Sequence, residues 1–499
     1  MSIWTSIIHT VANKAYQSEM QQAKKAVQNQ EKIFQMLISK AKNTEFGKQH
    51  HFGSIQTIQD YQSRVGIGDY ETNRSFFEQV KNGEKDILWP GKPKYLAKTS
   101  GTTSGTKYIP ITKASIPNHI NSARNALFSY LVHHKQSNAF AGKMLFLSGS
   151  PVLEKENGIL IGRLSGIVNH EIPAWFQKNK LPDGKVNSEP VWEKKVDLMI
   201  QQLLSHDLRV ISGIPPWIQM LLERTLEISG RESIAEVFPN LELYIHGGVN
   251  FNPYKKRLNQ LLGKPITMLE TYPASEGFFA YQNDPQDDGL LLLCNSGIFY
   301  EFVPFSEVNK NNPQRLTLNE VQIGVDYAII LSSNAGLWSY VIGDLVQFTS
   351  LSPYKIRVSG RVSQYISAFG EHVISSEIDH AITMAQSKFG FQLTEYSVAP
   401  QVNPLEGELP YHEWFIEFKT APSNLDEIAQ EINKQLIQKN TYYKDLITNQ
   451  ILQNLKIRVV KTDGFKNYLI SIGKYGEQFK VPRLSNDRKH ADSLMQYTL

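Results

Sequence analysis

The spacing of apolar residues along the chain predicts helices and strands in alternation. The pattern of residues 15–45 predicts one long helix with a charged, solvent-facing side and these apolar positions at helical spacing: Ala26, Phe34, Leu37 and Ala41. From residue 94 onward, short apolar runs broken by Gly, Asn and Pro alternate with helical stretches at 113–134 and 193–206, and the run LELYI predicts a strand ending at Ile245. This alternation predicts an α/β fold with a largely parallel sheet flanked by helices.

The pattern changes twice in the second half of the chain. Between residues 290 and 358 it is mostly β, with hairpin turns predicted at 295–297 and 334–336. After residue 360, helical stretches alternate with β-like runs, at 375–387, 414–418, 424–438 and 455–460. We therefore predict two domains, a large one over residues 1–360 and a small α+β one over residues 361–499.

Composition and charge exclude several classes of protein. The 499 residues include 52 Lys and Arg against 48 Asp and Glu, and a net charge of +4 is too weak to favour nucleic acid as a partner. No apolar run approaches the ~20 residues of a membrane helix, and no secretory signal is evident, so we expect a cytoplasmic protein with no membrane partner. The single cysteine, Cys294, excludes an internal disulfide and a cysteine-based zinc finger, and its apolar run predicts burial.

A glycine-rich segment, KTSGTTSGTK over residues 98–107, is the first candidate for chemistry. Its two glycines allow backbone amides to approach an anion, and its hydroxyl groups add donors for phosphate oxygens. It is not a Walker A loop, because Lys107 comes two residues after Gly105 and is followed by Tyr108. The flanks KYLA and KYIPIT predict that it joins two strands, so Lys107 and the loop itself would hold a phosphate. A flexible turn without a ligand fits the same residues.

Two further motifs carry side chains suited to a nucleotide. The segment ETYPASEG, residues 270–277, follows the apolar run PITML and offers an aromatic ring, a hydroxyl and a carboxylate that can hold Mg²⁺. In YVIGD, residues 340–344, an aspartate at a strand–turn junction can accept hydrogen bonds from a ribose diol. Each also fits an ordinary turn. The segments SGR at 359–361 and QFKVPR at 478–483 are additional candidates, although a lone lysine near a C-terminus usually lies on the surface.

Other catalytic patterns are missing from the sequence. His50–His51 and His133–His134 are adjacent pairs, and sequence neighbours do not face one ligand on a helix or a strand. The chain contains neither an HExxH motif nor a GxSxG nucleophile elbow. The sequence therefore gives little support to a histidine-based metal site or to a serine hydrolase.

The order and spacing of the motifs resemble the acyl-adenylate-forming, firefly luciferase-like superfamily. Within it, the chain resembles the auxin-responsive Gretchen Hagen family of acyl acid amido synthetases, in a bacterial-type form. The resemblance runs nearly end to end and rests on TSGTTSG, YPASE, YVIGD and QFKVPR, and also on IGDYETNRSFFEQVKNGEKDILWPGKPKYLA, YIHGGVN and AFGEHVISSEID. The chain departs from the family pattern in having one residue fewer between Gly105 and Lys107, and in Pro273 after the tyrosine.

The resemblance implies a role for each motif. Tyr272 would stack near adenine, Ser275 would contact the α-phosphate, and Glu276 would help to hold Mg²⁺. Asp344 would bind the ribose hydroxyls, and Lys480 would be the mobile catalytic lysine of the small domain. The loop residues implied to bind the ATP phosphates are Thr99, Ser100, Gly101, Thr102, Thr103 and Gly105. Arg361 and Val362 would lie at the hinge between the large adenylate-forming domain and the small mobile domain.

The implied activity is ATP-dependent activation of a small carboxylic acid as acyl-AMP, followed by transfer to the amine of an amino acid. ATP and Mg²⁺ are the expected cofactors, and the expected state is a monomer or a weak homo-oligomer. Two alternatives stay open at this point. An acyl-CoA ligase shares the adenylation step and differs in the acceptor, whereas a catalytically inactive nucleotide-binding sensor would keep only the binding.

Overall fold

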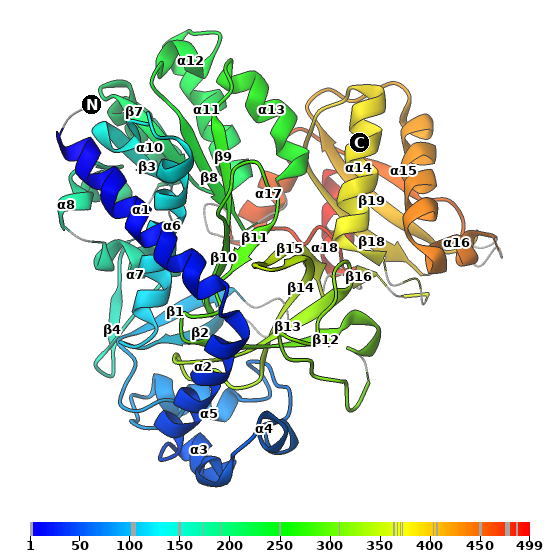
Figure 1. Cartoon of the computed structure of the whole chain (residues 1–499). Coiled ribbons are helices and arrows are strands. Elements are labelled where there is room, and N and C mark those ends of the chain that lie inside the picture. Colours follow the sequence, from blue (N-terminus) through cyan, green and yellow to red (C-terminus); the bar gives the residue numbers. More distant parts are fainter. Residues whose placement is uncertain are drawn as a thin grey trace. The chain divides into compact units, whose positions relative to one another are not determined.

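The chain, shown as a computed structural model in Figure 1, divides into two compact units. The first comprises Met1–Val249, Leu258–Ile342 and Val346–Val358, and the second comprises Asn250–Arg257, Gly343–Leu345 and Ser359–Leu499. The structure describes residues 3–100, 106–147, 151–172, 174–189, 191–248, 251–308, 310–362, 365–366, 368–369, 371, 373–402, 404–405, 408–448, 452–474, 480–485 and 488–499.

An 11-stranded mixed sheet contains most of the strands of the first unit. Its order is β12-β13-β14-β15-β11-β10-β9-β8-β7-β3-β6. The bounds are β3 (Lys143–Phe146), β6 (Lys180–Leu181), β7 (Leu208–Ser212), β8 (Leu243–Gly247), β9 (Thr267–Ala274), β10 (Gly277–Gln282), β11 (Leu290–Leu292), β12 (Ile298–Pro304), β13 (Asp326–Ser333), β14 (Tyr340–Leu351) and β15 (Tyr354–Arg361).

The α/β prediction is confirmed, and parallel pairing is concentrated where strands alternate with helices. Strands β6, β3, β7, β8 and β9 pair in parallel. Strands β9, β10, β11 and β15 pair antiparallel in succession, as do β12 and β13. Short turns suffice to connect antiparallel strands, whereas parallel strands need long crossovers. The sheet is therefore mixed rather than largely parallel, and its helix-rich half is the parallel one.

Helix α6 (Ile116–His133) packs on one face of the parallel half. Its Leu127 and Leu131 join a core cluster with Leu243 of β8 and Leu269 of β9, and helix α1 (Ile3–Ala23) runs beside α6 (Figure 1). The predicted helices at 113–134 and 193–206 are confirmed as α6 and α10. The remaining helices of this unit are α2 (Ala26–Ala41), α3 (Glu45–Gln49), α4 (Ile58–Arg64), α5 (Arg74–Lys81), α7 (Leu164–Glu171), α8 (Ala174–Gln177), α9 (Gly184–Asn187), α10 (Trp192–Leu204), α11 (Pro215–Ser229) and α12 (Ile234–Val237). Helix α13 (Asn252–Leu262) is divided between the two units.

The prediction of one helix over residues 15–45 is wrong, because α1 ends at Ala23 and α2 begins at Ala26. No Pro or Gly marks the break. The backbone oxygen of Gln22, at the end of α1, instead accepts from the N–H of Lys25 at 2.9 Å and from the side-chain amide of Asn29 at 3.0 Å. The inward face of α2 is as predicted, since Phe34 and Leu37 are buried.

One of the two predicted hairpin turns is wrong. Residues 295–297 lie between β11 and β12, but β11 pairs with β10 and β15, whereas β12 pairs with β13. Two apolar runs beside a turn do not by themselves specify that the runs pair with each other. The turn at 334–336 is confirmed, because it connects the neighbouring strands β13 and β14.

A separate four-stranded sheet carries the glycine-rich segment. Its order is β2-β1-β5-β4, with β1 (Tyr95–Ser100), β2 (Thr106–Ile111), β4 (Glu154–Glu156) and β5 (Ile159–Gly162). Strands β1 and β2 pair antiparallel. The prediction that this segment joins two strands is therefore confirmed.

A buried ion pair fastens an N-terminal segment to the large sheet. Nη2 of Arg315 lies 2.7 Å from Oε2 of the fully buried Glu301 on β12, and Nη1 donates to the carbonyl oxygen of Val65 at 2.5 Å. Replacing Arg315 with Met is expected to lower the free energy of unfolding by about 3–5 kcal/mol, because it leaves a carboxylate buried without its cationic partner. Denaturant unfolding of the full chain measures this loss. The Arg315→Met/Glu301→Gln double variant is expected to recover part of it, and a single variant as stable as the wild type would contradict the assignment.

The second unit contains a three-stranded sheet covered by helices. Strands β18 (Leu393–Gln401) and β19 (Tyr411–Phe418) are antiparallel, whereas β19 and β20 (Lys456–Val460) are parallel. The predicted helices and β-runs after residue 360 are confirmed as α14, α15, β19 and β20. The other elements here are β16 (Tyr365–Ile366), β17 (Val373–Ile374), α14 (Ser375–Phe389), α15 (Leu425–Lys439), α16 (Thr441–Thr448), α17 (Gly464–Ser471) and α18 (Lys489–Leu494).

Two expectations about the whole chain concern burial and membranes. Cys294 is 3% exposed, which confirms its predicted burial, and that burial raises the pKa of its thiol. Among the described residues, we find no helix with both the length and the apolar character needed to span a bilayer.

Candidate functional site

The YPASE motif forms the tip of a tight hairpin. Because Gly277 of β10 pairs with Ala274 of β9, Ser275 and Glu276 are the two residues of the turn, and both are half-buried. Strand β8 ends where its Gly247 pairs with Thr271, so β9 carries the turn beyond the carboxyl end of β8. Ligands of open α/β sheets bind outside the carboxyl ends of the strands, which makes this hairpin a candidate binding edge.

Local sequence explains how closely β8 and β9 approach each other there. A Cβ atom at Gly247 would lie 2.3 Å from the carbonyl oxygen of Thr271, so only glycine fits. The hydroxyl of Thr271 donates to the carbonyl oxygen of His246 at 3.0 Å. Tyr272 is 7% exposed, and its ring centroid lies 5.0 Å from that of Phe279. The packed strand therefore holds the tyrosine at the base of the hairpin.

Carboxylates from two separate segments act on Tyr340. Burial raises the pKa of Tyr340, and the negative charges of Glu276 and Asp69 raise it further. Burial alone would raise the pKa of Asp69, but hydrogen bonds from Thr72 and the charge of Lys107 hold it below its ordinary value. The carboxylates of Glu276, Asp69 and Glu71 thus act on Tyr340, and the ammonium group of Lys107 acts on Asp69.

The base of the glycine-rich loop joins this cluster through Lys107. Thr99 of β1 pairs with Lys107 of β2, and Ser100 pairs with Thr106. The predicted phosphate-binding residues Gly101, Thr102, Thr103 and Gly105 lie outside the described residues. The structure links Lys107, just after the loop, to Asp69, and it links both Asp69 and Glu276 to Tyr340.

In the second unit, Asp344 and Arg361 form an ion pair. Oδ1 of Asp344 lies 2.8 Å from Nε of Arg361, and the N–H of Val362 donates to the carbonyl oxygen of Gly343 at 2.6 Å. Asp344 lies inside β14 and not at a strand–turn junction, so that prediction is wrong. Gly343 has a φ of +87°, a conformation that glycine adopts without strain, so a Gly–Asp dipeptide that is common in turns fits inside this strand.

Lys480 of the QFKVPR segment is half-buried. Burial lowers its pKa to about 7, and the nearby charge of Arg483 contributes to the shift. Arg483 is itself fixed, because Nη2 donates to the hydroxyl of Tyr254 at 2.5 Å. Its guanidinium also lies 4.9 Å from the ring centroid of Tyr396. The carbonyl of Arg483 accepts a hydrogen bond from the N–H of Val398 on β18, so the segment is anchored to the small sheet.

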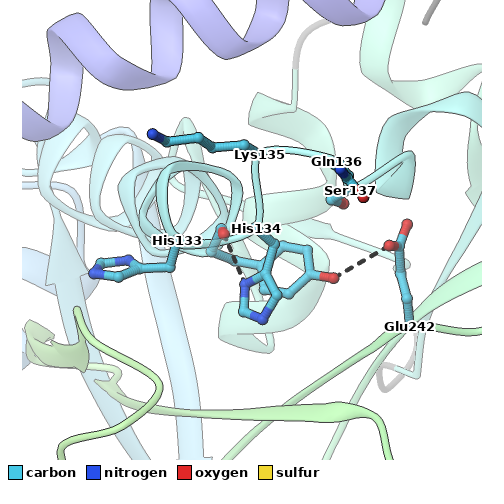
Figure 2. A pocket seen from close by; sticks show the side chains of 7 residues that line it. His133, His134, Lys135, Gln136, Ser137 and Glu242 are labelled. Atoms are coloured by element: carbon cyan, nitrogen blue, oxygen red, sulfur yellow. Dashed lines mark hydrogen bonds between the residues drawn. The ribbon is translucent and has the colours of Figure 1, made fainter.

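A different pocket, of about 500 Å³, is lined by the end of α6, the residues that follow it and Glu242 (Figure 2). The hydroxyl of Tyr130 donates to the carboxylate of Glu242 at 3.2 Å, and the ring centroid of His134 lies 4.3 Å from that of Tyr130. Glu242 directly precedes β8, so it lies at the amino end of that strand. The described lining includes none of the predicted site residues.

The structure adds residues that the sequence analysis missed. Asp69 lies in IGDYETN, which was noted only as part of a resemblance, and Arg483 follows Lys480 in QFKVPR. A charged residue beside a recognised motif was the available signal in both cases. Glu270 opens the segment ETYPASEG but was given no role of its own. Among the described residues, no group of three or more His, Cys, Asp and Glu side chains is placed to hold a metal ion.

Comparison with known proteins identifies the family of the chain. The chain matches the GH3 family N-terminal domain over residues 16–212, the GH3 family central domain over residues 291–361 and the GH3 family C-terminal domain over residues 376–489. Together these matches cover most of the sequence.

Relatives and solved structures agree with those matches. Indole-3-acetic acid-amido synthetase GH3.3 of Arabidopsis thaliana is 25% identical over 269 residues, which is 50% of this chain but only 44% of that relative. Jasmonoyl–L-amino acid synthetase JAR4 of Nicotiana attenuata is 20% identical over 531 residues, covering 91% of this chain and 90% of the relative. The fold is similar to that of AtGH3.15 acyl acid amido synthetase in complex with 2,4-DB, with a TM-score of 0.80 at 17% identity over 97% of this chain and 96% of that one. By its three domain matches, the chain belongs to the GH3 family.

Proposed function

We propose that this protein is an ATP-dependent acyl acid amido synthetase that activates a small carboxylic acid as an acyl adenylate and transfers the acyl group to the amine of an amino acid. The observation that carries the proposal is the Glu276 hairpin at the carboxyl edge of the sheet, where Glu276 and Asp69 act on Tyr340 and Lys107 acts on Asp69. Membership of the GH3 family supports the same activity.

The chemistry explains why charged and hydroxyl groups are needed without a protein nucleophile. A carboxylate resists attack by an amine because its leaving group would be oxide or hydroxide. Attack of the carboxylate on the α-phosphorus of ATP forms the acyl adenylate and releases pyrophosphate. Charge develops on the phosphoryl oxygens, so positioned cationic and hydrogen-bonding groups stabilise the transition state. An amine then attacks the acyl carbon, and AMP leaves.

The roles that we propose for individual residues follow the family resemblance. The loop between Thr99 and Gly105 binds the phosphates, Tyr272 lies near adenine, and Ser275 contacts the α-phosphate. Asp344 binds the ribose, and Lys480 stabilises charge on the α-phosphate. These assignments make Lys480 and Glu276 the catalytic pair.

The proposed magnesium site uses Glu276 as its only protein carboxylate. Mg²⁺ commonly binds through one or two carboxylates together with substrate phosphates and water, so a dedicated cluster of protein ligands is not required. The donor chemistry of the half-buried Glu276 fits this arrangement. When bound, the ion would offset charge on the phosphate oxygens.

We further propose that residues 361–499 move relative to residues 1–360 between the two half-reactions, with Arg361 and Val362 as the hinge. A movement of this kind would withdraw Lys480 after adenylation and admit the amine. The weak net charge of +4 supports a protein without a nucleic acid partner, and we propose a cytoplasmic monomer or weak homo-oligomer. Light scattering of the purified chain tests the oligomeric state.

Hydroxylamine trapping tests the proposed activity. The protein is incubated with ATP, Mg²⁺ and a panel of carboxylic acids, and hydroxamate formation reports the acyl adenylate. Mass spectrometry with amino acids or CoA supplied separately then identifies the acceptor. An amide product supports the proposal. A thioester without any amide would make the chain an acyl-CoA ligase, and silence across a broad panel would favour a nucleotide-binding sensor.

A further inference from the structure

Glu270 lies at the same edge of the sheet as the YPASE hairpin. It pairs with His246 of β8, one residue before that strand ends at Gly247. Leu269, on the other side of the strand, packs in the cluster beneath α6. Because successive side chains alternate between faces, Glu270 lies on the same side of β9 as Tyr272. The carboxylate of Glu270 therefore lies on the same face of β9 as the ring of Tyr272, six residues before Glu276 in the sequence.

The Glu270 carboxylate has no hydrogen-bond or ion-pair partner in the part of the chain that the structure describes. The side chain of Gln282, on the neighbouring strand β10, makes its hydrogen bonds to backbone groups and not to this carboxylate. The oxygen of Gln282 accepts from the backbone N–H of Glu270 at 3.1 Å, and its nitrogen donates to the carbonyl oxygen of Asp287 at 3.1 Å. A half-buried carboxylate without a partner is costly, and a cationic or hydrogen-bond-donating ligand would remove that cost.

The surroundings also make Glu270 an acceptor of protons near neutral pH. Burial raises the pKa of Glu270 to about 7, and the negative charge of Asp288 adds to the shift. The titratable side chains that face it are Asp288, on the loop before β11, and His246, beside it on β8. A general base works best when its pKa lies near the working pH.

We propose that Glu270 binds the ammonium group of the acceptor amino acid and removes one proton from it before the amine attacks the acyl adenylate. This inference rests on the proposed amido synthetase activity. It also accounts for an amine acceptor, since a half-buried carboxylate would repel the anionic phosphates of CoA. Nothing in the family resemblance assigned a role to this residue.

The step balances without a further reactant. The ammonium gives one proton to the carboxylate of Glu270 and becomes a neutral amine. Its lone pair forms the C–N bond at the acyl carbon, the bond from that carbon to the phosphate oxygen breaks, and AMP leaves with the bonding electrons. The second proton on nitrogen passes to water, and Glu270 returns its proton to solvent.

The choice of nucleophile separates this role from adenylation. Hydroxylamine is mostly unprotonated at neutral pH and needs no base, whereas an amino acid is mostly protonated. In Glu270→Gln, hydroxamate formation is expected to match that of the wild type, while amide formation at neutral pH falls by about 10²–10⁴-fold. Residual amide formation should rise with pH, as the fraction of free amine increases. The exposed Glu232→Gln is the matched control and should leave both products unchanged.

The outcomes test the role of Glu270 and the amido synthetase activity separately. Equal loss of hydroxamate and amide in Glu270→Gln would show that Glu270 serves adenylation or folding, and would overturn the inference. Unchanged amide formation would also overturn it while leaving the amido synthetase activity intact. If the wild-type protein forms no hydroxamate with any acid, the proposed function fails first and the inference fails with it.

Discussion

Replacing Lys480 with Ala is expected to lower acyl-adenylate formation by about 10²–10³-fold, because a cation that meets charge developing in the transition state is lost. Affinity for ATP is expected to fall far less, since several other groups are proposed to hold the nucleotide. In the structure, this side chain belongs to a segment that is anchored by its neighbour Arg483. It is half-buried, and Arg483, three residues later, is anchored to Tyr254 and Tyr396.

Comparing rate with affinity tests this expectation. The rate of hydroxamate formation reports adenylation, and equilibrium titration with ATP reports binding by the same preparation. Lys434 lies on α15 of the same unit and is exposed, so Lys434→Ala is the matched control and should change neither quantity. Equal losses of rate and affinity in Lys480→Ala would show that Lys480 is a binding or structural residue.

The charge of Lys480 gives a related expectation for pH. Its pKa is lowered to about 7 by burial and by Arg483, so the cation is present below that pH and is lost as the pH rises through it. Because kcat/KM for ATP reports groups of the free enzyme, it is expected to fall above pH ~7. In Lys480→Arg the cation persists across this range, and the fall should disappear even if the rate is lower. A fall that persists unchanged in this variant would assign it to another group.

The sequence predicted an element correctly where the residues that determine it are close together in the chain. The strands on both sides of the glycine-rich loop were predicted because β1 and β2 are adjacent in sequence and pair with each other. The turn at 295–297 was assigned to a hairpin because partners far away in the chain, β15 and β13, are not visible from the flanking runs. The break between α1 and α2 was missed because no Pro or Gly marks it, and the hydrogen bonds from the Lys25 N–H and the Asn29 amide to the carbonyl of Gln22 form only in the fold.

In the candidate site, too, the local features were predicted and the contacts between distant segments were not. Ser275 and Glu276 were predicted at a turn, and the hairpin between β9 and β10 confirms that. Neither the proximity of Lys107 to Asp69 nor that of Glu276 to Tyr340 was predicted, because charges from separate segments meet only after the chain folds. The unpartnered state of Glu270 is likewise a property of its surroundings. Sequence supplied the residue types, and packing decides which of them are desolvated.

Glu276→Gln is expected to lower adenylate formation by about 10²-fold and to raise the Mg²⁺ concentration needed for half-maximal rate, because a neutral amide is a weaker ligand for a hard cation than a carboxylate is. The tight turn and its half-buried position leave the variant side chain in the same place, so lost charge is the main change. Hydroxamate formation measured across a Mg²⁺ titration tests both effects.

Two further variants separate the charge of Glu276 from its place in the hairpin. Glu276→Asp keeps the carboxylate on a shorter side chain, so it should retain part of the activity while still requiring more Mg²⁺ than the wild type. The exposed Glu84→Gln removes the same charge elsewhere in the first unit and should leave the titration unchanged. If Glu276→Gln lost activity with no change in Mg²⁺ dependence, the carboxylate would act through its electrostatic effect on Tyr340, and the proposed magnesium site would need another ligand.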